Sequence, residues 1–167
     1  IIVERRKATS QWIDYLWRPV TALAGQPQTE PWTVLSQEAD LTTFYAGAVD
    51  VTLHQSETSD YRDNLAGDQA LWVVLRPADS DPPYQLFAVT ADPFEGEAFT
   101  ETGADLVEKV PLPKTLKDMM AEFIAEHHVE RAAAQVVDDR VDLRAHLLAT
   151  EEEVAQQRSP ARCVVLV

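Results

Sequence analysis

The stretch that most constrains the fold is ALWVVLRP, residues 70–77, a nearly continuous apolar run. A run without polar alternation is typical of a central strand that is covered on both faces. The turn-forming segment DSDPP follows it and leads to YQLFAVTA, residues 84–91, which again favours a strand. Because so short a connection has no room for a crossover helix, the two strands are predicted to form an antiparallel hairpin.

Segments on both sides of this hairpin also favour strands. The clearest is TTFYAGAVDVTLHQSE, residues 42–57, in which Val49, Val51 and Leu53 alternate with polar residues. Proline cannot donate a ladder hydrogen bond, so Pro19 is expected at a sheet edge or a bulge. Shorter strands are predicted at residues 1–7, 13–24, 32–39 and 106–110, whereas residues 58–69 are polar and turn-rich and residues 92–105 form an acidic loop or a short helix.

A helix is predicted near residues 114–128. Leu116, Met120, Phe123 and His127 fall at i, i+4, i+7 and i+11, which places them on one helical face. The sequence therefore predicts an α+β fold, with an antiparallel sheet or partly open barrel of about six or seven strands and a C-terminal helix packed on it.

The composition changes after the predicted helix. Residues 1–131 are interpreted as the sheet-plus-helix domain, and residues 132–167 as a helical or irregular tail. The tail ends in the apolar stretch SPARCVVLV, for which three interpretations stay open: an edge strand, a contact with another subunit that makes a homo-oligomer, or irregular structure.

The charge of the chain disfavours several classes of function. The net charge of −14 and the pI near 4.5 describe a surface that repels phosphate backbones and anionic lipid, so neither nucleic-acid nor membrane binding is expected. A single cysteine, Cys163, precludes an internal disulfide and fits a reducing cytoplasm. Apolar residues precede basic ones at residues 1–7, the reverse of a secretory signal, so none is expected.

Motifs for common chemistries are missing. The sequence contains neither a glycine-rich phosphate-binding motif nor a G-x-S-x-G nucleophile motif. Six carboxylates at residues 92–108 could bind a divalent cation, but no calcium-loop pattern organises them, and a solvated acidic face is favoured. These are Asp92, Glu95, Glu97, Glu101, Asp105 and Glu108.

Two adjacent histidines, His127 and His128, stand at the end of the predicted helix. Neighbouring helical residues do not face each other, and the H-x-x-x-H spacing of helical zinc sites is missing. The favoured interpretation makes His127 the end of the apolar face and leaves His128 near solvent at the helix terminus, instead of a metal site.

Two further groups are candidate binding sites. The first is a basic and aromatic strip that could recruit an acidic partner or a small anion, although long side chains lying over a sheet would give the same pattern. It consists of Arg5, Arg6, Trp12, Trp17 and Arg18. The second is a polar group at a strand end that could hold an anion or another ligand, or could cap the strand. It consists of His54, Glu57, Tyr61, Arg62 and Asn64.

An ordered set of short segments in residues 1–131 carries a family resemblance. The segments are VERR (3–6), WRP (17–19), LHQSET (53–58) with Tyr61 and NL (64–65), LWVVLRP (71–77), VTADPFEGEAF (89–99), VPLP (110–113) and HHVE (127–130). Together they resemble a bacterial family of unknown function that is encoded near formate dehydrogenase genes and often labelled molybdopterin-guanine dinucleotide biosynthesis protein A. The tail departs from that family, because AAAQVVDD stands where basic residues are expected.

The resemblance implies a non-enzymatic accessory or assembly protein of a molybdenum-dependent formate dehydrogenase, with a dehydrogenase subunit as partner and no cofactor of its own. The alternative is a molybdopterin- or nucleotide-handling enzyme of molybdenum cofactor biosynthesis, which would bind a molybdopterin nucleotide. The missing glycine-rich turn and the missing βαβ alternation weigh against that alternative.

Overall fold

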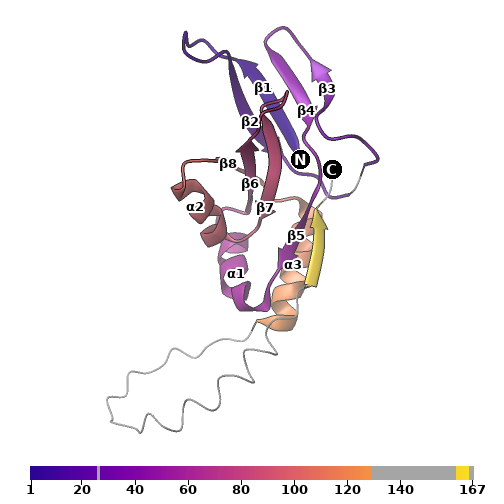
Figure 1. Ribbon diagram of the computed structural model, residues 1–167. Helices are drawn as coiled ribbons and strands as arrows, with labels where there is room; N and C mark the ends of the chain where they lie inside the picture. Colours follow the sequence, from indigo (N-terminus) through magenta and orange to yellow (C-terminus); the bar gives the residue numbers. More distant parts are fainter. Residues whose placement is uncertain (26, 129–160, 166–167) are drawn as a thin grey trace, which may run out of the picture.

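The computed structural model describes residues 1–25, 27–128 and 161–165. Figure 1 shows an α+β arrangement in which all strand pairs are antiparallel, as expected from the sequence. The first sheet has the order β2-β1-β4-β3 and forms the end of the molecule away from the helices. Its strands are β1 (Ile2–Lys7), β2 (Tyr15–Thr21), β3 (Thr33–Gln37) and β4 (Leu41–Tyr45).

The second sheet contains the predicted hairpin. Its order is β7-β6-β8, with β6 (Ala70–Pro77) between β7 (Tyr84–Thr90) and β8 (Leu106–Pro111). Every residue from Ala70 to Leu75 is buried, which confirms that the apolar run is a central strand.

The predicted long strand at residues 42–57 is wrong in its extent. Two strands occupy this segment, β4 and β5 (Val49–Leu53), and a short 3-10 helix, η1 (Gln55–Glu57), follows them. Between the two strands, Gly47 has a φ of +129°, a conformation that side chains disfavour, and there the chain leaves the first sheet. β5 pairs instead with β9 (Ala161–Val165), so the C-terminal segment adopts the edge-strand interpretation.

The predicted strand at residues 13–24 is shorter than expected, and β2 spans seven residues of it. β2 is an edge strand, and its register with β1 shifts beside Pro19. Pro19 therefore lies both at a sheet edge and at an irregularity of the strand pairing, the two positions expected for it. The Pro19 side chain is fully buried.

Three α-helices occur in the described residues. α1 (Thr58–Ala66) replaces the turn-rich segment expected at 58–69, and α2 (Pro93–Glu101) realises the short-helix option for 92–105. α3 (Lys114–His127) agrees with the prediction, since Leu116, Met120 and Phe123 are its buried residues. α1 escaped detection because its buried positions Thr58, Tyr61 and Asn64 are mostly polar.

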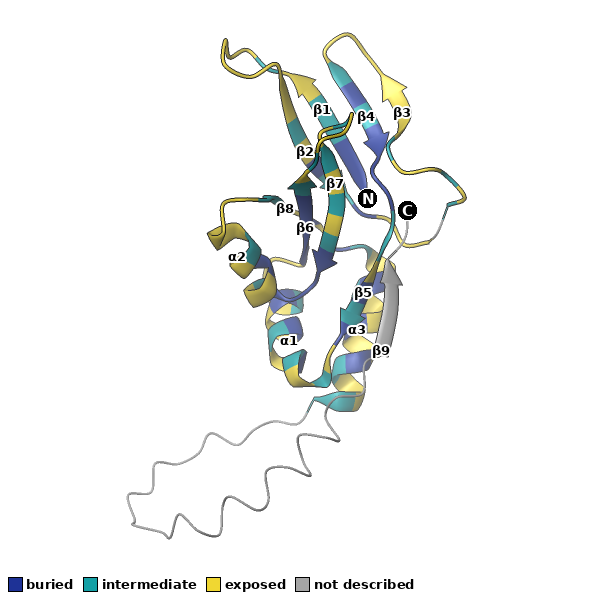
Figure 2. Ribbon diagram, in the orientation of Figure 1, coloured by how far each residue is buried: buried dark blue, intermediate teal, exposed yellow. Residues whose placement is uncertain are grey.

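The sheets and helices share one apolar core, shown in dark blue in Figure 2. β2 lies against β8, β5 lies against β7, and α1 packs against α3. The described strands do not close into a barrel. No helix in the described part of the chain is long and apolar enough to cross a bilayer. The helical interpretation of residues 132–160 lies outside the described residues, and the domain division at residue 131 stays a prediction.

The close contact between α2 and β6 gives a test of the fold. Gly96 is buried, and a Cβ added there would lie 2.1 Å from Cγ of Trp72. We expect Gly96→Ala to lower the free energy of unfolding by about 1–3 kcal/mol through overpacking, although alanine favours helices elsewhere. Urea denaturation measures this effect. Glu97→Ala, at the exposed neighbouring position, is the control and should change stability little; an unchanged midpoint for Gly96→Ala would contradict the packing.

Candidate functional site

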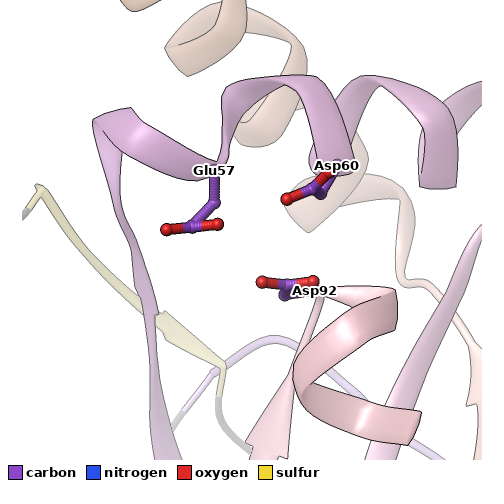
Figure 3. Close-up of side chains that lie close together, drawn as sticks. All are labelled: Glu57, Asp60 and Asp92. Carbon is purple, nitrogen blue, oxygen red and sulfur yellow. The ribbon is translucent and has the colours of Figure 1, made fainter.

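Three carboxylates converge where the N-terminal ends of α1 and α2 meet. Glu57 precedes α1, Asp60 lies in its first turn, and Asp92 is the N-cap of α2. One oxygen from each lies within 4.8 Å of the others, and Figure 3 shows the three groups facing a common space. We call these residues the carboxylate trio.

Asp92 is held rigidly. Its Oδ1 accepts hydrogen bonds from the backbone N–H groups of Phe94, at 2.8 Å, and Glu95, at 3.4 Å. Its own backbone N–H donates to Oγ1 of Thr90 at 3.1 Å. The Asp92 side chain is buried, and this burial raises its pKa despite the two backbone hydrogen bonds that lower it.

Asp60 shares this environment. Burial raises its pKa most, and the negative charges of Asp92 and Glu57 raise it further. Asp60 and Asp92 therefore hold a proton more readily than ordinary carboxyls do, and the three side chains can accept a positively charged group between their oxygens.

The predicted polar group is divided among different roles. Glu57 belongs to the carboxylate trio. The His54 side chain is exposed, while its backbone N–H donates to the Tyr61 hydroxyl at 3.1 Å. Tyr61 is buried, and burial raises its pKa to about 12, so the phenol stays neutral. These residues therefore do not converge on one anion site.

Asn64 has a structural role. Its side-chain nitrogen donates to the carbonyl oxygens of Ala70, at 2.9 Å, and Ala91, at 2.7 Å. Its side-chain oxygen accepts from the backbone N–H of Ala70 at 3.0 Å. Both partners are buried backbone, so this side chain links α1 to the start of β6 and to the end of β7.

The two histidines face different partners. His127 lies 4.6 Å from Phe123 between ring centroids, and its Nδ1 is 3.2 Å from Nε2 of Gln55. His128 has left the helix, and its Nδ1 lies 3.1 Å from Oγ1 of Thr58. Nε2 of His128 lies 3.0 Å from Nη1 of Arg62. His128 therefore joins α3 to α1, which corrects the expectation that it faces solvent.

The basic and aromatic strip is split by the alternation of the strands. Arg5 lies opposite Trp17, and these two share one sheet face. Arg6 and Arg18 lie on the other face, where Arg6 is 3.8 Å from Glu4 and Arg18 is 3.7 Å from Glu108. Trp12 lies in the connection between β1 and β2 and is 84% exposed.

Arg18 also lines a groove of about 650 Å³ beside β8 and α2. The groove combines two cations with three glutamates, so it has no single charge preference. It is lined by Arg18, Trp72, Glu97, Thr100, Glu101, Val107, Glu108 and Lys109. Another of the six predicted acids, Asp105, is bound to Arg76 by two contacts of 2.9 Å.

Sequence reasoning missed the carboxylate trio. Glu57 and Asp92 were assigned to separate groups, and Asp60 was not singled out. The only available signal was the helix-capping position of Asp92 before Pro93, because nothing in the spacing of residues 57, 60 and 92 indicates that they meet.

Residues 1–136 match the model of a protein family of unknown function, DUF3305. The chain belongs to the DUF3305 family. The match covers the sheets, the three helices and all residues of the two predicted binding groups, and β9 follows it in the sequence. No curated protein and no solved structure matched the chain.

The raised pKa of Asp92 predicts that Asp92→Asn increases the stability of the protein by an amount that depends on pH. Above 3.8, the ordinary pKa of aspartate, the unfolded chain loses this proton before the folded protein does. The contribution of Asp92 to stability therefore falls as pH rises from 3.8 through its folded pKa. Asparagine keeps the helix cap without the charge, so we expect the variant to have the higher Tm at pH 7 and a shrinking advantage on acidification.

Thermal melts between pH 4 and pH 8 measure this difference. Asp92→Ala is the matched control, because it removes both the charge and the cap, and loss of the cap costs about 1 kcal/mol. A pH-independent difference between Asp92→Asn and the wild type would contradict the raised pKa.

Proposed function

We propose that this DUF3305 protein is a non-enzymatic accessory protein that takes part in assembling a molybdenum-dependent formate dehydrogenase in the cytoplasm. The observation that carries the interaction role is the surface of the β1–β2 hairpin. The choice of partner rests on the resemblance of residues 1–131 to a family encoded near formate dehydrogenase genes.

Exposed apolar side chains gather at this end of the molecule. Ten large apolar residues of the described part are exposed, and six of them lie near the β1–β2 connection or on β3. These six are Trp12, Ile13, Tyr15, Leu16, Val34 and Leu35. Such concentration is typical of a protein-binding surface, and tryptophan and tyrosine are enriched among residues that dominate binding energy.

The hairpin also differs in charge from the rest of the chain. Residues 1–21 carry four basic and two acidic side chains, a net charge of +2 on a chain whose total is −14. A partner surface with an apolar pocket and acidic surroundings would complement it. Four of the six exposed apolar side chains and the basic residues therefore lie on one hairpin, whose outer part Figure 2 shows mainly in yellow.

Replacing the apolar tip tests this proposal. We expect Trp12→Ala combined with Leu16→Ala to weaken capture of formate dehydrogenase by tenfold or more, since truncation of a binding hot spot costs about 2 kcal/mol or more. Affinity capture with purified dehydrogenase, followed by titration of the complex, measures the loss.

Phe94→Ala is the matched control. Phe94 is 68% exposed on α2, in another part of the molecule, and its replacement removes an exposed aromatic side chain outside the hairpin. Equal capture by the tip variant, the control and the wild type would refute the proposed docking surface.

A second function, handling of a molybdopterin nucleotide, is favoured by the carboxylate trio. Carboxylate oxygens are the ligands that Mg²⁺ prefers, and a protein-held Mg²⁺ commonly bridges to the phosphates of a nucleotide. Under this proposal Glu57, Asp60 and Asp92 hold the ion, and the nucleotide binds through it.

Calorimetry with GTP and Mg²⁺ tests the second function. We expect binding only when both are present, with affinity reduced at least tenfold by Glu57→Gln combined with Asp60→Asn, because two of three ligands are lost. Glu97→Gln, outside the trio, is the control. Equal binding of GTP with and without Mg²⁺ would contradict a role for the trio.

A further inference from the structure

The two faces of the first sheet carry different sets of side chains. Residues directly opposite each other on neighbouring strands share a face. Arg5 lies opposite Trp17 on β2 and Thr42 on β4, and Lys7 lies opposite Tyr15. We call the face that bears Arg5, Lys7, Tyr15 and Trp17 the aromatic face.

Within residues 1–25, 27–128 and 161–165, no carboxylate oxygen lies within 4.0 Å of the cations of the aromatic face. Of the nine Lys and Arg residues in positions 1–128, six have a carboxylate oxygen within 4.0 Å: Arg6, Arg18, Arg62, Arg76, Lys109 and Lys114. Lys117 binds the side-chain oxygen of Gln69 at 2.7 Å. Arg5 and Lys7 remain, and they lie on the same face of the same strand.

This lack of pairing does not come from a shortage of acids. The chain has 28 acidic against 14 basic residues, and the neighbouring Arg6 is paired with Glu4 on the opposite face. The acids near β1 therefore neutralise one face of the sheet and leave the aromatic face positive. An acidic ligand would find here a local positive charge on an otherwise negative protein.

Arg5 is held in a fixed orientation. The central carbon of its guanidinium lies 4.6 Å from the ring centroid of Tyr15, 5.6 Å from that of Trp17 and 5.3 Å from that of Phe44. Its Nη2 donates to Oγ1 of Thr42 at 3.3 Å. A guanidinium stacked on rings and tethered at one nitrogen is pre-organised to bind a carboxylate with the donors that are left.

The buried Nε of Arg5 has no hydrogen-bond acceptor in the described residues. A buried donor without an acceptor lowers stability, and the strand could avoid this cost with a neutral residue at position 5. The aromatic face thus keeps a cation that rings and Thr42 hold in place but that has no carboxylate among the described residues, and this points to a carboxylate from an external partner.

We propose that the aromatic face binds an extended, acidic segment of a partner protein, with one carboxylate on Arg5 and a second on Lys7. The two cations are two residues apart on a strand, about 6–7 Å along its axis. Alternate side chains of an extended peptide repeat at the same distance and point the same way. This inference rests on the proposed interaction role and adds the chemistry of the segment that is recognised.

A synthetic peptide with glutamate at alternate positions and valine or threonine between them is the direct probe, titrated into the full-length protein. Its binding should quench tryptophan fluorescence, because Trp17 lies beside Arg5, and should weaken as salt is added. The same peptide with glutamine in place of glutamate is expected not to bind. Equal binding of the two peptides would overturn the proposal.

Variants of three neighbouring residues locate the site. We expect Arg5→Lys and Lys7→Gln each to weaken peptide binding about tenfold, which corresponds to the loss of one charged hydrogen bond. Arg5→Lys keeps the charge but loses the planar guanidinium. Arg6→Gln, on the opposite face, is the matched control and should bind as the wild type does. Because the side chain of Lys7 is exposed, Lys7→Gln tests the site even if variants at Arg5 do not fold. A loss for Arg6→Gln as large as that for Lys7→Gln would contradict the assignment to one face.

Other polyanions test whether the ligand is a protein segment. Vesicles containing anionic lipid and a DNA duplex are expected to bind more weakly than the peptide, and equal or tighter binding by either would overturn the proposal. Peptide binding and capture of formate dehydrogenase can fail independently. Capture without peptide binding would reject this inference alone, whereas peptide binding without capture would reject the proposed dehydrogenase partner and leave the inference standing.

Discussion

The fold depends on covering both faces of β6 while still providing hydrogen-bond partners for the backbone groups at its start. Six consecutive buried residues, Ala70–Leu75, leave no face of this strand for water. α2 approaches so closely that only glycine fits at position 96 against Trp72. At the start of the strand, the side chain of Asn64 exchanges two hydrogen bonds with the backbone of Ala70 and donates a third to Ala91. One buried amide thus fixes α1 against the second sheet.

The same amide positions the carboxylate trio. Ala91, which accepts from Asn64, directly precedes Asp92, and Asp60 lies one helical turn before Asn64 on α1. Fixing these two backbone segments therefore brings the side chains of Asp60 and Asp92 together. This proximity has a cost, because burial raises the pKa of both carboxyls and the charge of Asp92 raises that of Asp60 further. Two helix N-termini meet at this point, and their partial positive charge offsets part of the repulsion.

Apolar residues predicted the elements whose buried positions are apolar. β6 follows from its continuous apolar run, β7 from its strand-favouring residues, and α3 from the helical spacing of Leu116, Met120 and Phe123. α1 was missed because its inner face consists of Thr58, Tyr61 and Asn64, and the two polar residues among them have partners distant in sequence, His128 and Ala91. The break between β4 and β5 was missed because it depends on the conformation of Gly47. Such features follow from tertiary contacts, which a local pattern does not contain.

The two predicted binding groups show which part of a site a sequence can provide. The alternation of a strand already separates Arg5 from Arg6, so the predicted strand at residues 1–7 contained the division of the basic strip between two faces. The predicted strand did not contain the pairing of charges. Glu4 lies beside Arg6 on the same strand, whereas Glu108 pairs with Arg18 from a different sheet. That Arg5 and Lys7 have no carboxylate partner in the described part of the chain is therefore a property of its fold. In a protein with an acidic surface, the placement of its acids decides where an anionic segment can approach, and the half-buried Arg5 and the exposed Lys7 mark such a place on the β1–β2 hairpin.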